Sequence, residues 1–173
     1  LHKLLLDILP LFHGGGLCDL SLSVMYCCGT IVLRRNFSAS EFWQCVEQYQ
    51  VNGFYIVPTM WNILLRTPEA DSVDTSSLRI AISGAAPIPP EQLDECETRF
   101  HIPILEGYGA TENSGGISAN MEDKRKYGSI GTPFSGIQVK IFNDNAEPLS
   151  PGEIGEIVVK GDTVMKGYYN SPD

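Results

Sequence analysis

The stretch LRIAISGAAPIPPEQLDECETRFHIPILEG, residues 78–107, decides the fold. It begins with a short apolar run, continues as a polar segment and ends with a second apolar run. Prolines at the start of the middle segment, acidic residues in its first turns and Arg99 near its end are typical of an α-helix. A strand, a helix and another strand in this order predict two parallel strands joined by a right-handed crossover.

Three further apolar runs extend this alternation toward the N-terminus and predict strands. They are DILPLF (7–12), TIVL (30–33) and GFYIVP (53–58). Between the last two runs, Ser38 and Glu41 predict a capping box at the start of a helix, and apolar residues recur along one face of that helix. The residues on this face are Phe42, Cys45, Val46 and Tyr49. We therefore expect an α/β fold with a doubly wound, mostly parallel sheet.

The pattern changes after about residue 122. GIQVKIF (136–142) alternates apolar and polar residues, NDNAEPLSPG is rich in turn formers, and EIGEIVVKG (153–161) predicts a second half-exposed strand. We therefore predict an α/β subdomain over residues 1–122 and an incomplete, antiparallel β-barrel-like subdomain over residues 123–173. In the connection MEDKRKYGS, the basic residues predict a solvated linker rather than a binding patch. These basic residues are Lys124, Arg125 and Lys126.

Composition and charge limit what the chain binds and where it resides. The apolar stretch 17–33 contains Asp19 and Gly29 and is too short for a membrane span, so it predicts a buried helix leading into a buried strand, and no transmembrane segment. A net charge of −9 disfavours nucleic acid and anionic lipid as partners. The five cysteines lack C-x-x-C spacing, so they predict no zinc site or disulfide framework and suit a reducing, cytoplasmic location. Nothing in the sequence indicates an oligomeric state.

Glycine and polar residues follow the predicted strands at the edge where ligands of doubly wound sheets bind. HGGG (13–16), SGAAP (83–87) and EGYGATE (106–112) are three such loops. Glycine allows the backbone to approach a ligand closely, the Thr111 hydroxyl can contact a phosphate and Glu112 can hold Mg²⁺. This spacing is compatible with a magnesium–nucleotide site, but equally with a plain turn in which Thr111 caps a helix and Glu112 complements its dipole. His13 precedes three glycines and suits a gate or a polar contact rather than a metal site.

Several blocks of the sequence resemble one known family. LEGYGATE (105–112) resembles the Tyr-Gly-x-Thr-Glu signature of the adenylate-forming superfamily, which contains acyl-CoA synthetases, luciferases and amino-acid adenylation domains. Further blocks are similar to successive blocks of the acyl-CoA synthetase large domain, in the same order. They are LPLFHGGGL, YIVPTMWNILL, LRIAISGAAPIPPEQ, GSIGTPFSGIQVKI and GEIGEIVVKGDTVMKGYYN.

This resemblance implies a function and a set of site residues. The family reaction forms acyl-AMP from ATP and a carboxylic acid, and then acyl-CoA from coenzyme A, and a fatty acid is the expected acid. The resemblance implies that Thr111, Glu112 and His13 are catalytic, that Glu112 binds Mg²⁺ and that His13 lies at the acyl or thioester tunnel. It also implies that ATP or AMP is bound by Gly84, Ala85, Ala86, Pro87, Glu106, Gly107, Tyr108, Gly109 and Thr111.

Other functions in the same family remain open. The chain could belong to an amino-acid or aryl-acid adenylation domain, or to a non-catalytic nucleotide-binding module, although EGYGATE favours a CoA ligase over amino-acid activation. The sequence lacks the family's phosphate loop, its ribose-binding block and its C-terminal domain with the adenylation lysine. We therefore expect an internal fragment of the large domain that is inactive by itself.

Overall fold

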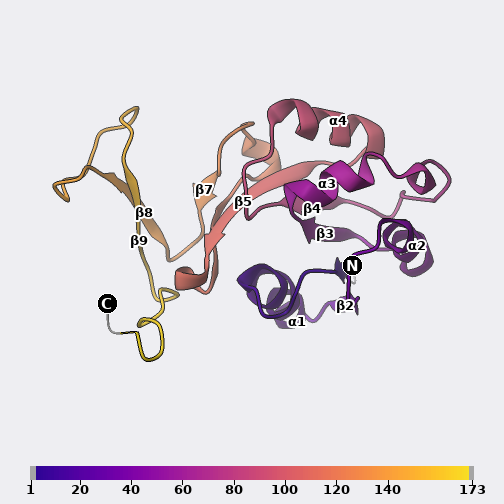
Figure 1. The fold of residues 1–173 in the computed structure, drawn as a ribbon, viewed down its shortest axis with the longest axis horizontal. Coiled ribbons are helices and arrows are strands. Elements are labelled where there is room, and N and C mark those ends of the chain that lie inside the picture. The colour runs from indigo at the N-terminus through magenta and orange to yellow at the C-terminus, as the bar shows by residue number, and fades with distance from the viewer. Residues whose placement is uncertain (1–2, 172–173) are drawn as a thin grey trace.

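The computed structural model describes residues 3–171. In this part of the chain, seven strands form one sheet in the order β2-β1-β3-β4-β5-β6-β7, and two more strands, β8 and β9, form a separate sheet. Figure 1 shows helices on both sides of the large sheet and the β8–β9 hairpin beside its far end. The predicted α/β fold with a mostly parallel sheet and a small antiparallel sheet is therefore confirmed.

The first five strands run parallel, and the remaining pairs are antiparallel. The strands are β1 Leu4–Asp7, β2 Thr30–Leu33, β3 Gly53–Ile56, β4 Ile80–Ser83, β5 Ile104–Ala110, β6 Gly115–Ala119, β7 Thr132–Pro133, β8 Gln138–Phe142 and β9 Glu156–Lys160. The strand predicted over 7–12 is wrong, because β1 ends at Asp7. The Asp7 carboxylate accepts the Leu9 N–H at 3.1 Å and turns the chain, and Pro10 has no N–H to offer a ladder.

Helices α2, α3 and α4 enclose the main core on one face of the sheet. The helical segments are η1 Gly15–Leu22, α1 Ser23–Tyr26, α2 Ala39–Tyr49, α3 Pro58–Leu64, η2 Pro68–Asp71, α4 Pro90–Phe100, η3 Thr111–Asn113 and η4 Glu122–Lys124. Trp43 of α2 packs on Phe100 of α4 with ring centroids 4.7 Å apart, and Trp61 of α3 packs on Phe54 of β3 at 5.5 Å. Aromatic burial therefore joins the three helices to the sheet.

The connection that follows β1 lies on the opposite face. Figure 1 shows α1 on one side of the sheet and α3 and α4 on the other. The segment η1, which precedes α1, contacts β1, β3 and β6. Its Ser21 donates a hydrogen bond to the buried Asp7 carboxylate at 2.6 Å, which ties η1 to the end of β1. The strand order thus reverses between β1 and β3, and such a switch point is where doubly wound folds bind ligands.

Two local predictions fail near the N-terminus. Ser38 is the N-cap residue of α2, but its hydroxyl shares a hydrogen bond with Ser40 and makes no capping bond, and Glu41 pairs with Arg34 instead of closing a capping box. The stretch 17–33 is not a buried helix and strand: Met25 and Tyr26 are exposed, and β2 is a half-exposed edge strand. Among residues 3–171, β2 pairs with β1 alone and so forms the edge of the sheet.

The large sheet continues beyond residue 122, because β7 pairs with β6. The predicted division between residues 1–122 and 123–173 stays a prediction. Within residues 3–171, no helix combines the length and the hydropathy that a membrane span requires.

Candidate functional site

A pocket of about 340 Å³ opens at the switch point between β1 and β3. The segments that follow β1, β3 and β4 line it together with the end of β5 and the start of β6. Leu9, Val57 and Met60 supply apolar walls, whereas His13 and Thr111 supply polar groups. Such a combination of apolar surface and a few polar groups is typical of small-molecule sites.

Glycine makes room for Tyr55 inside this pocket. A Cβ atom on Gly84 would lie 2.5 Å from the Tyr55 hydroxyl oxygen, and one on Gly15 would lie 3.1 Å from the Tyr55 ring. The loop after β4 must therefore carry glycine at position 84 if the ring is to keep this place, and a side chain at position 15 would crowd it. Burial, and to a smaller extent the charge of Asp19, raises the pKa of the Tyr55 phenol to about 12, so the phenol is neutral at physiological pH.

Asp19 is a pocket residue that the sequence did not predict as functional. It lies on η1, and its Oδ1 atom accepts the backbone N–H of Gly116 on β6 at 2.7 Å. Burial raises the pKa of the carboxyl, and the Gly116 hydrogen bond opposes this shift. The available signal was a lone carboxylate inside an apolar stretch. Tyr55 gave a weaker signal, because it stands in a continuous buried strand run.

Four of the predicted site residues come together in this pocket. His13, Ala85, Gly109 and Thr111 all line it, although they are up to 98 positions apart in the chain, since 111 − 13 = 98. His13 is exposed at the pocket, and its ring lies 4.7 Å from that of Phe12. The predicted convergence of the loops at the carboxyl edge of the sheet is therefore observed for these residues.

Glu112 lies next to Thr111 on η3 and is exposed. Its Oε1 atom accepts a hydrogen bond from the Tyr168 hydroxyl at 2.6 Å, and its backbone carbonyl accepts the Met165 N–H at 2.7 Å. The Tyr168 hydrogen bond lowers the pKa of the Glu112 carboxyl. The segment around Tyr168 therefore holds this carboxylate in place, a role that sequence reasoning missed although the residue lies in the GYYN part of a matching block.

The predicted metal role of Glu112 fits the donor groups around it. In residues 3–171, no group of three or more His, Cys, Asp and Glu side chains is placed to hold a metal ion. Mg²⁺ at nucleotide sites is usually bound through one or two carboxylates plus substrate phosphates and water. A single exposed carboxylate suits that mode, in which the nucleotide supplies most ligands.

The other predicted nucleotide-binding residues do not line this pocket. Gly107 and Tyr108 lie in β5 and pair with Ala119 and Ser118 of β6. Gly84 is buried, whereas Ala86 and Pro87 are exposed in the loop after β4. The nucleotide contacts expected for these residues stay predictions.

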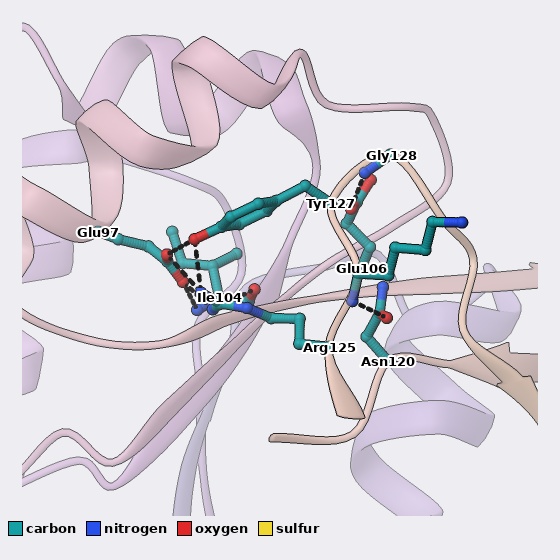
Figure 2. Close-up of polar contacts among 8 residues, drawn as sticks. Glu97, Ile104, Glu106, Asn120, Arg125, Tyr127 and Gly128 are labelled. Carbon is teal, nitrogen blue, oxygen red and sulfur yellow. Dashed lines mark hydrogen bonds and ion pairs between the residues drawn. The ribbon is translucent and has the colours of Figure 1, made fainter. Parts of the chain in front are cut away.

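Glu106 faces the linker after β6 rather than the pocket. Its Oε2 atom accepts the Gly128 N–H at 3.1 Å, as Figure 2 shows. Burial raises the pKa of this carboxyl, and the Gly128 bond and the charge of Arg125 lower it. The geometry favours a contact between the Glu106 side chain and the linker over a contact with a nucleotide. We therefore assign Glu106 to holding the linker.

The linker is also fixed at a second point by Glu97, Arg125 and Tyr127, which we call the linker clasp. The Arg125 guanidinium forms an ion pair with Glu97 of α4, and the Tyr127 hydroxyl donates to Glu97 Oε2 at 3.0 Å (Figure 2). Glu97 Oε1 also accepts the Ile104 N–H at 2.6 Å, at the start of β5. The predicted solvated linker is therefore wrong for Arg125, whose side chain is mostly buried.

Comparisons with known proteins agree with this geometry. A model of the AMP-binding enzyme family matches residues 2–169. Sulfoacetate–CoA ligase of Cupriavidus necator is 35% identical over 97% of this chain and 33% of its own length. Feruloyl-CoA synthase of Amycolatopsis sp. is 36% identical over 95% of this chain and 34% of its own length.

A solved structure of O-succinylbenzoate coenzyme A synthetase (MenE) from Bacillus subtilis, in complex with ATP and magnesium ion, superposes with a TM-score of 0.82. It is 35% identical over 97% of this chain and 34% of that chain. The chain thus spans about a third of the length of each of these relatives. Because the family model covers almost all of its residues, the chain belongs to the AMP-binding enzyme family.

Proposed function

We propose that this chain forms the acyl-facing and phosphate-facing part of an ATP-dependent carboxylic acid:CoA ligase. The observation that carries the proposal is the pocket at the β1–β3 switch point, where His13 and Thr111 meet an apolar wall. An enzyme of this kind must hold an apolar acyl group beside a polyanionic nucleotide, and this pocket offers both kinds of surface. Membership of the AMP-binding family supports the same function.

The reaction has two steps. First, an oxygen of the substrate carboxylate attacks the α-phosphorus of ATP, and pyrophosphate leaves to give acyl-AMP. Second, the thiolate of coenzyme A attacks the acyl carbonyl carbon, and AMP leaves. Both steps bring an anion to an anionic or crowded centre, so positioning and charge neutralisation are the main tasks of the protein.

Four residues in and beside the pocket then have tasks that match their places. The Thr111 hydroxyl donates a hydrogen bond to a phosphate oxygen, and His13 makes a polar contact with the acyl carboxylate or the thioester. Glu112 would hold Mg²⁺, which supplies positive charge that offsets the repulsion between the attacking carboxylate and the phosphates. Tyr168 keeps the Glu112 carboxylate oriented through its hydrogen bond.

The acid itself is less well defined. The predicted fatty acid rests on how common such substrates are, and two relatives carry the names of sulfoacetate and feruloyl-CoA instead. The predicted cytoplasmic location likewise stays a prediction. We therefore place the function at the level of a carboxylic acid:CoA ligase.

The first test is carboxylate-dependent exchange of pyrophosphate into ATP by the intact protein, over a panel of fatty, aromatic, short-chain and amino acids. Exchange with one class of carboxylic acid, followed by CoA-dependent thioester formation, is the expected result. Folded protein that binds Mg-ATP but exchanges with none of the acids would contradict the proposal and favour a non-catalytic module.

The role of Glu112 is tested by Glu112→Gln, which removes the charge but keeps the shape. We expect kcat/KM for Mg-ATP to fall about tenfold or more, since a lost metal contact worth about 1.4 kcal/mol gives a factor of ten. Glu122→Gln makes the same change at an exposed carboxylate on η4 and should leave exchange unaltered. Equal kinetics for the two variants would remove the assigned role.

A further inference from the structure

The pocket wall contains a fixed carboxylate that the proposed reaction does not use. Among the described residues that line the pocket, Asp19 is the only acidic one, and none is Lys or Arg. An acyl substrate therefore meets one acidic side chain with no Lys or Arg beside it in the described pocket lining. This arrangement bears on which acids can enter.

Two glycines of β6 fix the position of the Asp19 carboxylate. Gly116 donates its N–H to Asp19 Oδ1 at 2.7 Å. A Cβ atom on Gly115 would lie 2.3 Å from the same oxygen, and Gly115 has a φ of +125°, a conformation that side chains disfavour. The Asp19 carboxylate is thus held against the β6 backbone, where glycine provides the space that it occupies.

The same carboxylate has unused hydrogen-bonding capacity. Within residues 3–171, the Gly116 N–H is its only hydrogen-bond donor, and Oδ2 has no partner. An ionised carboxylate has room for about four accepted hydrogen bonds, and a partly buried one is costly unless donors satisfy it. A hydroxyl or ammonium group on the substrate would supply such a donor, whereas a second carboxylate or a sulfonate would add a like charge.

We propose that Asp19 sets the charge class of the acyl substrate: the pocket accepts a monocarboxylic acid, favours one that carries a hydroxyl or amine donor on its apolar body, and rejects an acid with a second acidic group. The inference rests on the proposed ligase function. It concerns selectivity, because a site discriminates through repulsion of the wrong ligand as well as attraction of the right one.

The experiment measures ATP–pyrophosphate exchange by the intact protein with matched acids of two lengths. The six-carbon set is hexanoate, 6-hydroxyhexanoate, 6-aminohexanoate and hexanedioate, and the eight-carbon set is built in the same way. We expect the hydroxy or amino acid to exceed the plain acid in kcat/KM, and the diacid to be at least about tenfold poorer than the plain acid. A diacid used as well as its plain monoacid would overturn the proposal.

The variant that separates charge from structure is Asp19→Asn. Its carboxamide oxygen still accepts the Gly116 N–H, so the link between η1 and β6 is kept while the negative charge is removed. We expect kcat/KM for the diacid to gain about tenfold relative to the plain acid, and kcat/KM for the amino acid to lose a similar factor relative to the plain acid. Unchanged ratios in Asp19→Asn would show that Asp19 only links η1 to β6.

A matched control and a second readout complete the test. Asp144→Asn removes a charge from an exposed carboxylate that lines neither this pocket nor the second pocket to which Asp19 contributes, and it should leave the ratios as they were. Thermal protection by the same acids repeats the comparison without turnover, because a ligand that binds the native state stabilises it. Exchange with monoacids but no effect of Asp19→Asn would overturn only this inference, whereas neither exchange nor protection with any acid would overturn the ligase function and this inference with it.

Discussion

The helix-covered face of the sheet consists of buried aromatic side chains, whereas the pocket edge consists of exposed polar residues and glycine. On the covered face, Trp43 and Trp61 are fully buried and their rings pack on neighbouring aromatic side chains. At the pocket edge, His13 and Glu112 are exposed, and glycine allows backbone segments to approach. Stability therefore depends on one region and ligand contact on the other, so substitutions in the two regions should separate loss of folding from loss of function.

The largest effect is expected in the covered face. Trp61→Ala removes a fully buried side chain that packs on Phe54 and Phe100, and it should lower the free energy of unfolding by about 3–5 kcal/mol. Ile63→Ala lies on the same helix at a position that is 48% exposed and should cost much less. Urea denaturation of both variants checks this difference. Equal losses would mean that α3 does not seal the core as the ring contacts indicate.

At the pocket edge, Gly115→Ala adds one methyl group and should lower the stability of the fold strongly. The residue has a φ of +125°, and the added Cβ would lie 2.3 Å from Asp19 Oδ1. We expect a loss of about 2 kcal/mol or more in stability, from backbone strain together with the overlap.

Gly167→Ala is the control for Gly115→Ala, because Gly167 has a similarly positive φ, +139°, but nothing lies within 4 Å of its Cβ position. The difference between the two variants in thermal denaturation isolates the overlap with Asp19. If Gly167→Ala costs as much, backbone strain alone explains the effect and the fit between β6 and η1 contributes little.

The linker clasp extends the comparison, because it is a group of polar contacts that joins the linker to α4, away from the pocket. Arg125→Met leaves the mostly buried Glu97 carboxylate without its cation, although Tyr127 and Ile104 still donate to it. We expect a loss of about 1–3 kcal/mol. Lys124→Met removes the same charge from an exposed neighbour and should be near neutral. Chemical denaturation of the two variants distinguishes a clasp from a solvated linker, for which both would be neutral.

The sequence predicts the sheet well where strands alternate with amphipathic helices, and poorly where apolar residues line a loop. Ile8 and Leu9 are buried although they follow the end of β1, so an apolar run alone placed the first strand too late. Local patterns cannot distinguish a buried strand from a buried loop, because both place apolar residues inside.

The same limit explains which site residues were predicted. Thr111 and His13 stand in glycine-rich loops that mark strand exits, so a local pattern reveals them. Asp19 acquires its role from Gly116, 97 residues away, and Glu112 from Tyr168, 56 residues away. Helical and strand periodicities span only a few residues, so such pairs are invisible until the fold brings them together.

The smallest effect on stability is expected for Tyr168→Phe, which tests how the pocket edge fixes an exposed carboxylate. The Tyr168 hydroxyl stabilises the ionised form of Glu112 and lowers its pKa, so the variant should raise that pKa toward its ordinary value. Because the pKa of Glu112 is lower in the folded protein than its ordinary value, the ionised carboxylate stabilises the fold at pH values above the ordinary pKa. This stabilisation is lost as the pH falls through the folded-state pKa, and the variant should lack this pH dependence. Carboxyl NMR titration measures the shift, with Tyr169→Phe at an exposed neighbour as the control. Because Mg²⁺ would bind the same carboxylate, a Glu112 pKa that does not move would mean that Tyr168 does not orient the proposed metal ligand.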